Sequence, residues 1–163
     1  ELTSNQPKLS FWLADGNDNE QVTTDILSLD TWYHIVGTND GEHSRIYVNG
    51  ILQNSIEQGD VGLTDSNPLK LGLHANLDEQ DRYWLGDLDE IAVWNDTLTD
   101  IEILDLYNSG LGKDASIDYG NYTSSSDLKG YWKFNEGNGN TLHDFSGNEN
   151  HGQIYGATFQ VSP

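Results

Sequence analysis

The sequence predicts an all-β fold, an antiparallel β-sandwich with one short helix. Short runs rich in β-branched and aromatic residues recur along the 163-residue chain, and Gly-, Asn- and Asp-containing turn sequences separate them. The connections between neighbouring runs are too short for the crossovers that parallel strands need, which favours antiparallel pairing. A single capping-box pattern marks the helix.

The first two thirds of the chain consist mainly of predicted strands. Asn49-Gly50 is the strongest hairpin sequence, because a two-residue turn of this type matches the twist of the strands on either side. The predicted strands are residues 9–13, 31–37, 45–48, 51–52, 69–73 and 84–94.

The predicted helix follows these strands. Thr99 is expected as its N-cap and Glu102 as its third helical residue, the spacing of a capping box. Ile101, Leu104 and Tyr107 share one face, which we expect to pack on an edge of the sandwich, and Gly110 is expected to end the helix.

The last third of the chain predicts a separate segment. Residues 113–127 are rich in Ser, Asp, Tyr and Gly without a clear period, which indicates a linker. Residues 128–134 again resemble a strand, and residues 151–159 suggest one more strand pair around Gly156. The expected organisation is therefore one unit over residues 1–112, the linker, and a further segment over residues 128–163.

Charge and composition exclude several classes of function. The chain has 27 acidic and 7 basic residues, a formal net charge of −20, so nucleic acid and anionic lipid would be repelled. It has no Cys and no apolar run long enough to insert in a membrane. Five Trp, eight Tyr and four Phe favour a folded domain over disorder. The strand pattern is already under way at Glu1, so we expect a processed or cut N-terminus.

Two groups of motifs resemble the laminin-G-like jelly rolls of the concanavalin A-like lectin/glucanase superfamily. The first group is similar to the C-terminal two thirds of that domain and consists of residues 32–36, 40–41, 46–50, 71–72, 86–95, 98–99 and 102–103. The second group is similar to the opening of the domain and consists of residues 130–137, 144–152 and 156–158. The resemblance implies a jelly-roll sandwich and covers most of the chain.

The order of the two groups is reversed relative to the family, because the opening motif follows the closing one. Three explanations stay open: the end of one repeat joined to the start of the next, a circular permutant, or a sandwich completed by another chain. We favour a fragment of a larger multidomain protein whose C-terminal segment docks back on the first. A sandwich without its partner strands would leave sheet edges open.

The resemblance also implies a structural calcium ion, held between the opening loop and the closing acidic strand. Residues 144–152 offer hard oxygens on a glycine-bent loop, as calcium requires. The expected ligands are the side chains of Asp89, Asp144 and Asn148 and backbone oxygens around Asn150 and His151. Glu90 is the weaker alternative to Asp89, because neighbouring strand residues point to opposite faces. The competing interpretation is an Asx-rich turn without an ion.

A carbohydrate site would pair an aromatic platform with polar groups that fix sugar hydroxyls. The resemblance assigns Trp32, Trp84, Trp94 and Trp132 to packing, which leaves Trp12 as the expected platform. Polar and aromatic residues near the same loops complete the predicted ligand site, namely Asp15, His74, Asn76, Arg82 and Tyr83.

No catalytic constellation is predicted. Asp87 and Asp89 would share a strand face, but their stretch resembles the family's closing strand and lacks the Glu-x-Asp-x-x-Glu order of its glucanases. His34 is interpreted as a packing histidine. We therefore expect a non-catalytic, calcium-stabilised, lectin-like module of a larger secreted or cell-surface protein, whose partners are a polysaccharide or glycan and neighbouring domains. The alternatives are an adhesion or spacer module that binds protein, and a glycan-cleaving enzyme.

Overall fold

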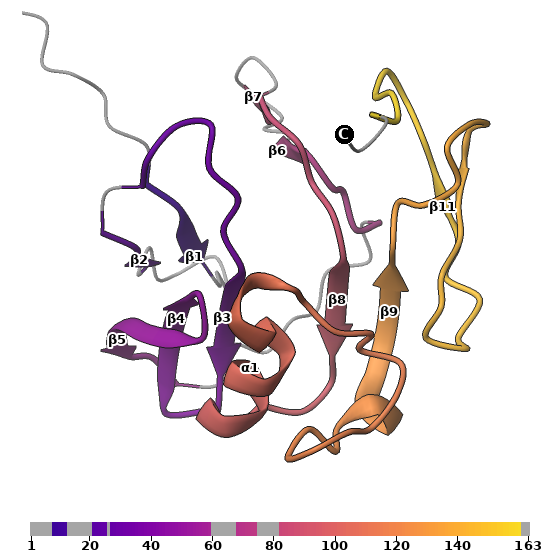
Figure 1. Ribbon diagram of the computed structural model, residues 1–163. Coiled ribbons are helices and arrows are strands. Elements are labelled where there is room, and N and C mark those ends of the chain that lie inside the picture. Colours follow the sequence, from indigo (N-terminus) through magenta and orange to yellow (C-terminus); the bar gives the residue numbers. More distant parts are fainter. Residues whose placement is uncertain (1–7, 13–20, 26, 60–67, 75–81, 161–163) are drawn as a thin grey trace, which may run out of the picture. The chain divides into compact units, whose positions relative to one another are not determined.

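The computed structural model of the chain describes residues 8–12, 21–25, 27–59, 68–74 and 82–160 (Figure 1). These residues form two compact units. The first unit comprises residues 1–63 and 94–128, and the second comprises residues 64–93 and 129–163. Each unit is described by itself below.

The first unit is built on a three-stranded antiparallel sheet of β3 (Ile35–Asn39), β4 (His43–Val48) and β5 (Ile51–Glu57). Asn49 and Gly50 join β4 to β5 and both have positive φ, 52° and 77°, as a primed hairpin turn requires. The hairpin predicted from the sequence is therefore confirmed.

Two short strands, β1 (Ser10–Trp12) and β2 (Gln21–Thr23), form a second antiparallel pair in the same unit. The ring of Phe11 lies against Gly37 of β3, where an added Cβ would be 2.4 Å from Phe11 Cδ2. Val22 of β2 is fully buried. The sequence did not predict β2, because three residues are too few to show a strand period.

Helix α1 (Asp100–Tyr107) begins at the predicted capping box. Thr99 Oγ1 accepts a hydrogen bond from the Glu102 amide, and the Glu102 carboxylate accepts one from the Thr99 amide at 3.0 Å. The helix ends at Asn108, whose φ of 46° is left-handed, and not at Gly110, which closes the short 3-10 turn η1 (Asn108–Gly110).

The buried face of α1 differs from the expected one. Ile103, Leu106 and Glu102 are buried, whereas Ile101 and Leu104 are mostly exposed. Glu102 is buried because the following segment folds over it: the hydroxyl of Ser124 donates to Glu102 Oε1 at 2.6 Å. Burial acts to raise the pKa of Glu102, but hydrogen bonds led by that of Ser124 outweigh it and lower the pKa.

The segment over residues 113–127 packs within the first unit. Tyr122 is fully buried, and its hydroxyl donates to Ala115 O at 2.7 Å and accepts from Trp94 Nε1 at 3.0 Å. Burial raises the pKa of Tyr122 to about 12. The segment ends in the 3-10 turn η2 (Ser125–Asp127). The domain boundaries proposed from the sequence stay a prediction.

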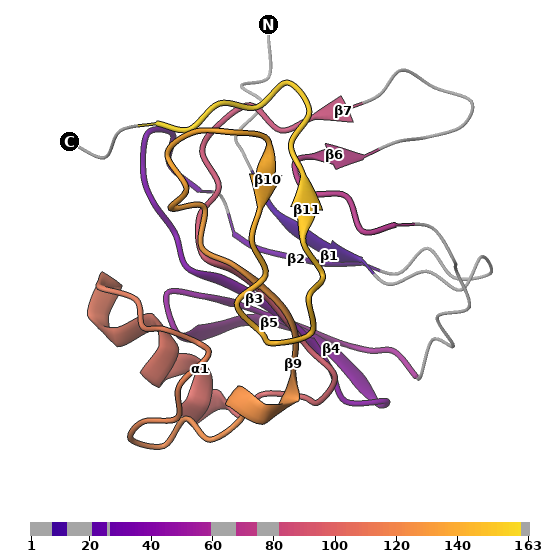
Figure 2. The same cartoon turned by 90° about the vertical axis from the view of Figure 1, so that its right-hand side faces the viewer.

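The second unit contains three pairs of short strands. In the described residues these are β6 (Leu73–His74) with β7 (Arg82–Tyr83) and β10 (Thr141–Leu142) with β11 (Gly152–Gln153), both seen in Figure 2, and β8 (Ile91–Trp94) with β9 (Leu128–Trp132), seen in Figure 1. The end residues Trp94 and Leu128 are grouped with the first unit. Strand β9 carries the opening motif and β8 the closing motif, so the two motifs pair within this chain.

The C-terminal strand pair lies elsewhere than predicted. The pair is β10 with β11, and the Ile154 amide extends it by donating to Asn140 O at 2.8 Å. The expectation of a pair around Gly156 is wrong, because the partner of residues 152–153 precedes the acidic loop and does not follow Gly156. Tyr131, Trp132 and Leu142 are the buried apolar residues of this region. In the described residues no helix is long and apolar enough to cross a membrane.

Candidate functional site

The loop predicted to hold calcium is organised by Asp144. Its Oδ1 accepts hydrogen bonds from the amides of Tyr131 and Ser146, both at 2.8 Å. Its Oδ2 accepts from the Ser146 hydroxyl at 2.8 Å and the Asn150 amide at 2.9 Å. Burial acts to raise the pKa of Asp144, but these hydrogen bonds outweigh it, so the carboxyl pKa is lowered.

The other predicted ligands of this loop also make hydrogen bonds within the unit. The Asn148 amide nitrogens donate to Ser146 Oγ, and Asn150 O accepts from Trp132 Nε1 at 3.0 Å. His151 Nδ1 accepts from the Asp144 backbone amide at 3.0 Å. The loop is thus a closed Asx-type turn in which hydrogen-bond donors face the carboxylate.

A calcium ion at this loop would have to replace hydrogen bonds that the loop makes. Calcium requires six to eight oxygens directed at one point, and among the described residues no group of three or more His, Asp or Glu is arranged to hold a metal. Both oxygens of Asp144 face N–H or O–H donors, so an ion would have to displace hydrogen bonds. Calcium binding stays a prediction.

Asp89 and Glu90 do not lie in a strand, so the expectation that they point to opposite faces of a strand does not apply to them. Both residues precede β8, and Glu90 has a left-handed φ of 51°. Asp89 Oδ1 accepts from the Glu90 amide at 3.0 Å, and burial raises the pKa of the Asp89 carboxyl. The Glu90 carboxylate accepts a short hydrogen bond from the Tyr131 hydroxyl. The two carboxylates differ in their hydrogen-bond partners and not in the face of a strand on which they lie.

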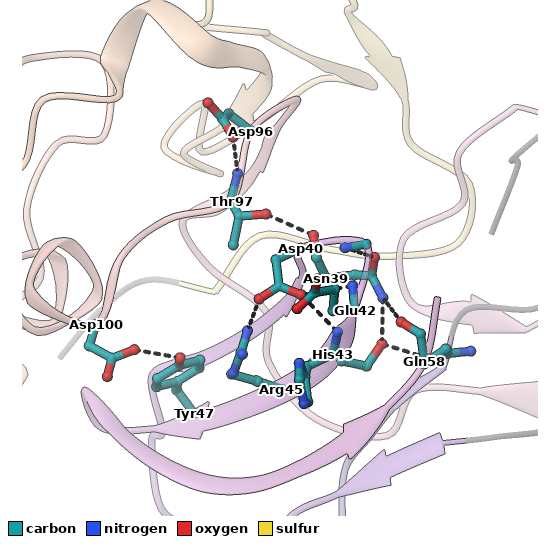
Figure 3. A network of polar contacts seen from close by, with 12 residues as sticks. Asn39, Asp40, Glu42, His43, Arg45, Tyr47, Gln58, Asp96, Thr97 and Asp100 are labelled. Atoms are coloured by element: carbon teal, nitrogen blue, oxygen red, sulfur yellow. Dashed lines mark hydrogen bonds and ion pairs between the residues drawn. The ribbon is translucent and has the colours of Figure 1, made fainter. Parts of the chain in front are cut away.

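A network of polar side chains at the β3–β4 turn has a structural role (Figure 3). Asp40 accepts from the amides of Glu42 and His43 and pairs with Arg45 Nη1 at 2.5 Å, which together hold the pKa of Asp40 well below its usual range. Nearby, the Thr97 hydroxyl donates to Asn39 O at 2.7 Å. These groups hydrogen-bond one another, and the bond between Thr97 and Asn39 joins the turn to the segment before α1.

The predicted carbohydrate ligands fall mostly outside the described side chains. Asp15 and Asn76 lie outside the described residues. Trp12, His74 and Arg82 have described backbones in β1, β6 and β7, but their side chains are not described. Tyr83 is described, and 67% of its surface is exposed. Of this set, the structure therefore presents Tyr83 on a surface.

Two of the four tryptophans assigned to packing are instead exposed. The assignment holds for Trp132, which is buried, and for Trp94, which is half-buried and bonded to Tyr122. It is wrong for Trp32, 66% exposed, and for Trp84, 45% exposed. Neither residue lies within a strand, so no strand period directs its side chain to a core. Trp84 Nε1 donates to Asp87 O at 3.4 Å.

Trp32 lies on a turn over residues 28–33 whose backbone is held by hydrogen bonds. The Ser28 amide donates to the Tyr33 hydroxyl oxygen at 3.0 Å, and the Thr31 hydroxyl donates to Leu29 O at 3.1 Å. Asp30 supplies the left-handed φ of 53° that the turn needs. The sequence does not reveal this surface, because residues 31–34 have the composition of a strand although β3 begins at Ile35.

His34, the next residue along, has no catalytic partner in the described part of the chain. Its ring stacks on Tyr107 with centroids 5.9 Å apart, and its buried Nδ1 has no hydrogen-bond partner there. Burial lowers the pKa of His34. These contacts fit a packing residue.

Comparison with solved structures gives two matches. A protein from Bacteroides ovatus, named as a candidate carbohydrate binding protein, is 24% identical with a TM-score of 0.62, over 82% of this chain and 37% of that one. An S-layer domain-containing protein from Clostridium thermocellum is 19% identical with a TM-score of 0.46, over 61% of this chain and 50% of that one. The chain thus spans well under two thirds of the length of either.

Comparison of the sequence with protein-family models identifies a family. No curated protein matches the chain. The model of a laminin-G-like family does match, over residues 1–104. The antiparallel strands and the short capped helix agree with that family's sandwich. The chain belongs to the laminin-G-like branch of the concanavalin A-like lectin/glucanases superfamily.

Proposed function

We propose that this chain is a non-catalytic carbohydrate-binding module. The observation that carries the proposal is the exposure of large aromatic side chains on a lectin-type fold, with Trp32 66% and Tyr83 67% exposed. Aromatic side chains combine an apolar face, which packs against the C–H face of a sugar ring, with a polar group that can hydrogen-bond a hydroxyl. The naming of the Bacteroides ovatus structure supports the same class of ligand.

The alternative of a glycan-cleaving enzyme has weaker support. Glycosidases need one carboxyl as acid and a second as base or nucleophile across the scissile bond. Asp89 Oδ1 accepts a hydrogen bond from the Glu90 amide, and the stretch that holds Asp87 and Asp89 resembles the closing strand of the family and not the catalytic strand of its glucanases. Release of reducing ends from a bound polysaccharide would identify an enzyme instead.

The proposal also covers the location of the module and its stabilisation by calcium. We place the module in a larger secreted or cell-surface protein, because polysaccharides that such modules bind lie outside cells. Calcium stabilisation is part of the proposal, since a chain of net charge −20 would be relieved of repulsion by a bound cation. An adhesion or spacer module that binds protein is the second candidate, favoured by the exposed Ile101 and Leu104 of α1.

A glycan array is the experiment that tests the function. The folded chain would be applied with calcium and again with chelator, alongside a Trp32→Ala/Tyr83→Ala double variant. Leu111→Ala is the matched control, because Leu111 is an exposed apolar residue that is not aromatic. Binding to one class of polysaccharide by the wild type and the control is expected. Failure of the folded wild type to bind any glycan would overturn the proposal and favour the protein-binding alternative.

A further inference from the structure

We propose that Trp32 is the stacking platform for a neutral pyranose ring, a site that rests on the proposed carbohydrate-binding function and gives it a place and a ligand class. The site is the turn over residues 28–33, with the indole face as platform. The hydroxyl of Thr31 and the carboxylate of Asp30 are the polar groups beside it in the chain.

The turn is rigid enough to present an aromatic ring. On one side of Trp32, the Ser28 amide is bonded to the Tyr33 hydroxyl at 3.0 Å. On the other side, His34 and Asn49 exchange two bonds: the His34 amide donates to Asn49 Oδ1 at 3.0 Å, and the Asn49 amide donates to His34 O at 2.8 Å. Trp32 is therefore held between a closed turn and the end of a hairpin. A platform fixed before binding loses less conformational entropy when a ligand arrives.

The indole itself is free for a ligand. It is 66% exposed, and its N–H donates to no residue in the described part of the chain. Leu29, three residues earlier in the same turn, is also exposed, at 75%. An ordered tryptophan with an unused N–H offers both an apolar face and a donor, the pair of features by which an aromatic side chain binds a hydroxylated ring.

Trp84 is a weaker platform by the same criteria. Its N–H is used on Asp87 O, and a Cβ at Gly86 would be 3.1 Å from Trp84 Nε1, so the Gly86 backbone lies against the ring. The ring is also less exposed, at 45%. Trp84 therefore supports the turn before β8, which makes it the matched aromatic control for Trp32.

Charge decides which sugars the site takes. The chain carries a net charge of −20, Asp30 lies within the turn, and Asp25 lies three residues before it. Uronate or sulfated polymers would be repelled at low ionic strength, whereas neutral polymers would not. The ligand class is therefore a neutral polysaccharide, such as a glucan, mannan or galactan.

Affinity electrophoresis in gels that contain soluble polysaccharide tests the site. The probes are neutral β-glucan, galactomannan and, as an acidic polymer, polygalacturonate, each with the wild type, Trp32→Ala and Trp84→Ala. Circular dichroism melts establish that each variant is folded. We expect the variants to fold because Trp32 and Trp84 are both exposed. Trp32→Ala is expected to weaken retardation by the neutral polymer about tenfold or more, as loss of a hot-spot aromatic does, and Trp84→Ala by less than about twofold.

The outcomes separate this site from the general function. Neutral-polymer binding that survives Trp32→Ala, or that is lost only in Trp84→Ala, overturns the Trp32 site and leaves the carbohydrate-binding function standing. Binding confined to polygalacturonate overturns the neutral class of ligand. Absence of binding by the folded wild type to every polysaccharide overturns the proposed function, and the site with it.

Discussion

The hydroxyl oxygen of Tyr33 accepts a hydrogen bond from the Ser28 amide at 3.0 Å, and this bond closes the turn that presents Trp32. The amide donor stabilises the phenolate form and lowers the pKa of Tyr33. We therefore expect Tyr33 to affect ligand binding by holding the backbone of the turn and not by contacting the ligand.

Tyr33→Phe is expected to weaken binding of a neutral polysaccharide by roughly three- to tenfold. Phenylalanine keeps the ring but cannot accept the Ser28 bond, so the turn gains conformations that do not bind. Isothermal titration with a soluble oligosaccharide measures the loss, and the melting temperature should change little because the bond is exposed. Tyr155→Phe, at a residue 85% exposed, is the control and should bind as the wild type does. Equal affinities in all three proteins would contradict the role given to Tyr33.

His34 should make the stability of the chain depend on pH. Burial lowers its pKa in the folded state below the ordinary value of 6.5, so the unfolded chain binds the proton more readily. Stability is expected to be intact above about pH 7 and to fall as the pH drops below 6.5 toward the folded pKa. Urea unfolding at a series of pH values measures the effect.

His34→Phe is the comparison for this titration, because it keeps a ring to stack on Tyr107 and removes the titrating nitrogen. The variant should lose less free energy of unfolding than the wild type between pH 7 and pH 5. Parallel losses in the two proteins would assign the pH dependence to other groups.

Gly130→Ala is expected to destabilise the chain by roughly 1–3 kcal/mol, the range for overpacking. A Cβ at Gly130 would lie 2.3 Å from Trp132 Cη2, and the buried indole is held by its bond to Asn150 O. Gly59→Ala is the control, because its Cβ would meet nothing nearer than Gly41 O at 4.0 Å. Thermal melts compare the two. A Gly130→Ala variant as stable as Gly59→Ala would show that the indole can move away at little cost.

Calcium should raise the melting temperature if it binds the folded chain. The gain in free energy of unfolding is about 2.7 kcal/mol when free calcium is about 100 times its Kd. Magnesium at equal concentration is the control, because any divalent cation screens a charge of −20. Asp89→Asn should abolish the calcium-specific part and leave the ion-free melt nearly unchanged. Equal shifts with the two ions would assign the effect to screening.

Local sequence determined the elements whose cause is local. Thr99 and Glu102 form the capping box because both partners lie within one helical turn. Asn49-Gly50 makes the hairpin because these two residues tolerate positive φ. The family resemblance rests on such segments, and the match over residues 1–104 confirms it.

Only the tertiary structure decided which side chains are buried. The apolar pattern put Ile101 and Leu104 on the packed face of α1, but Ser124 and Thr123, some twenty residues later, bond Glu102 and turn that face inward. Trp32 and Trp132 are both expected to pack in a core. Trp32 instead lies on an exposed turn, whereas Trp132 is buried and lies over Gly130. Burial is set by contacts between residues distant in sequence, so the sequence by itself determined the hairpin and the helix start, whereas the tertiary structure decided that Trp32 and Trp84 are exposed and Trp132 is buried.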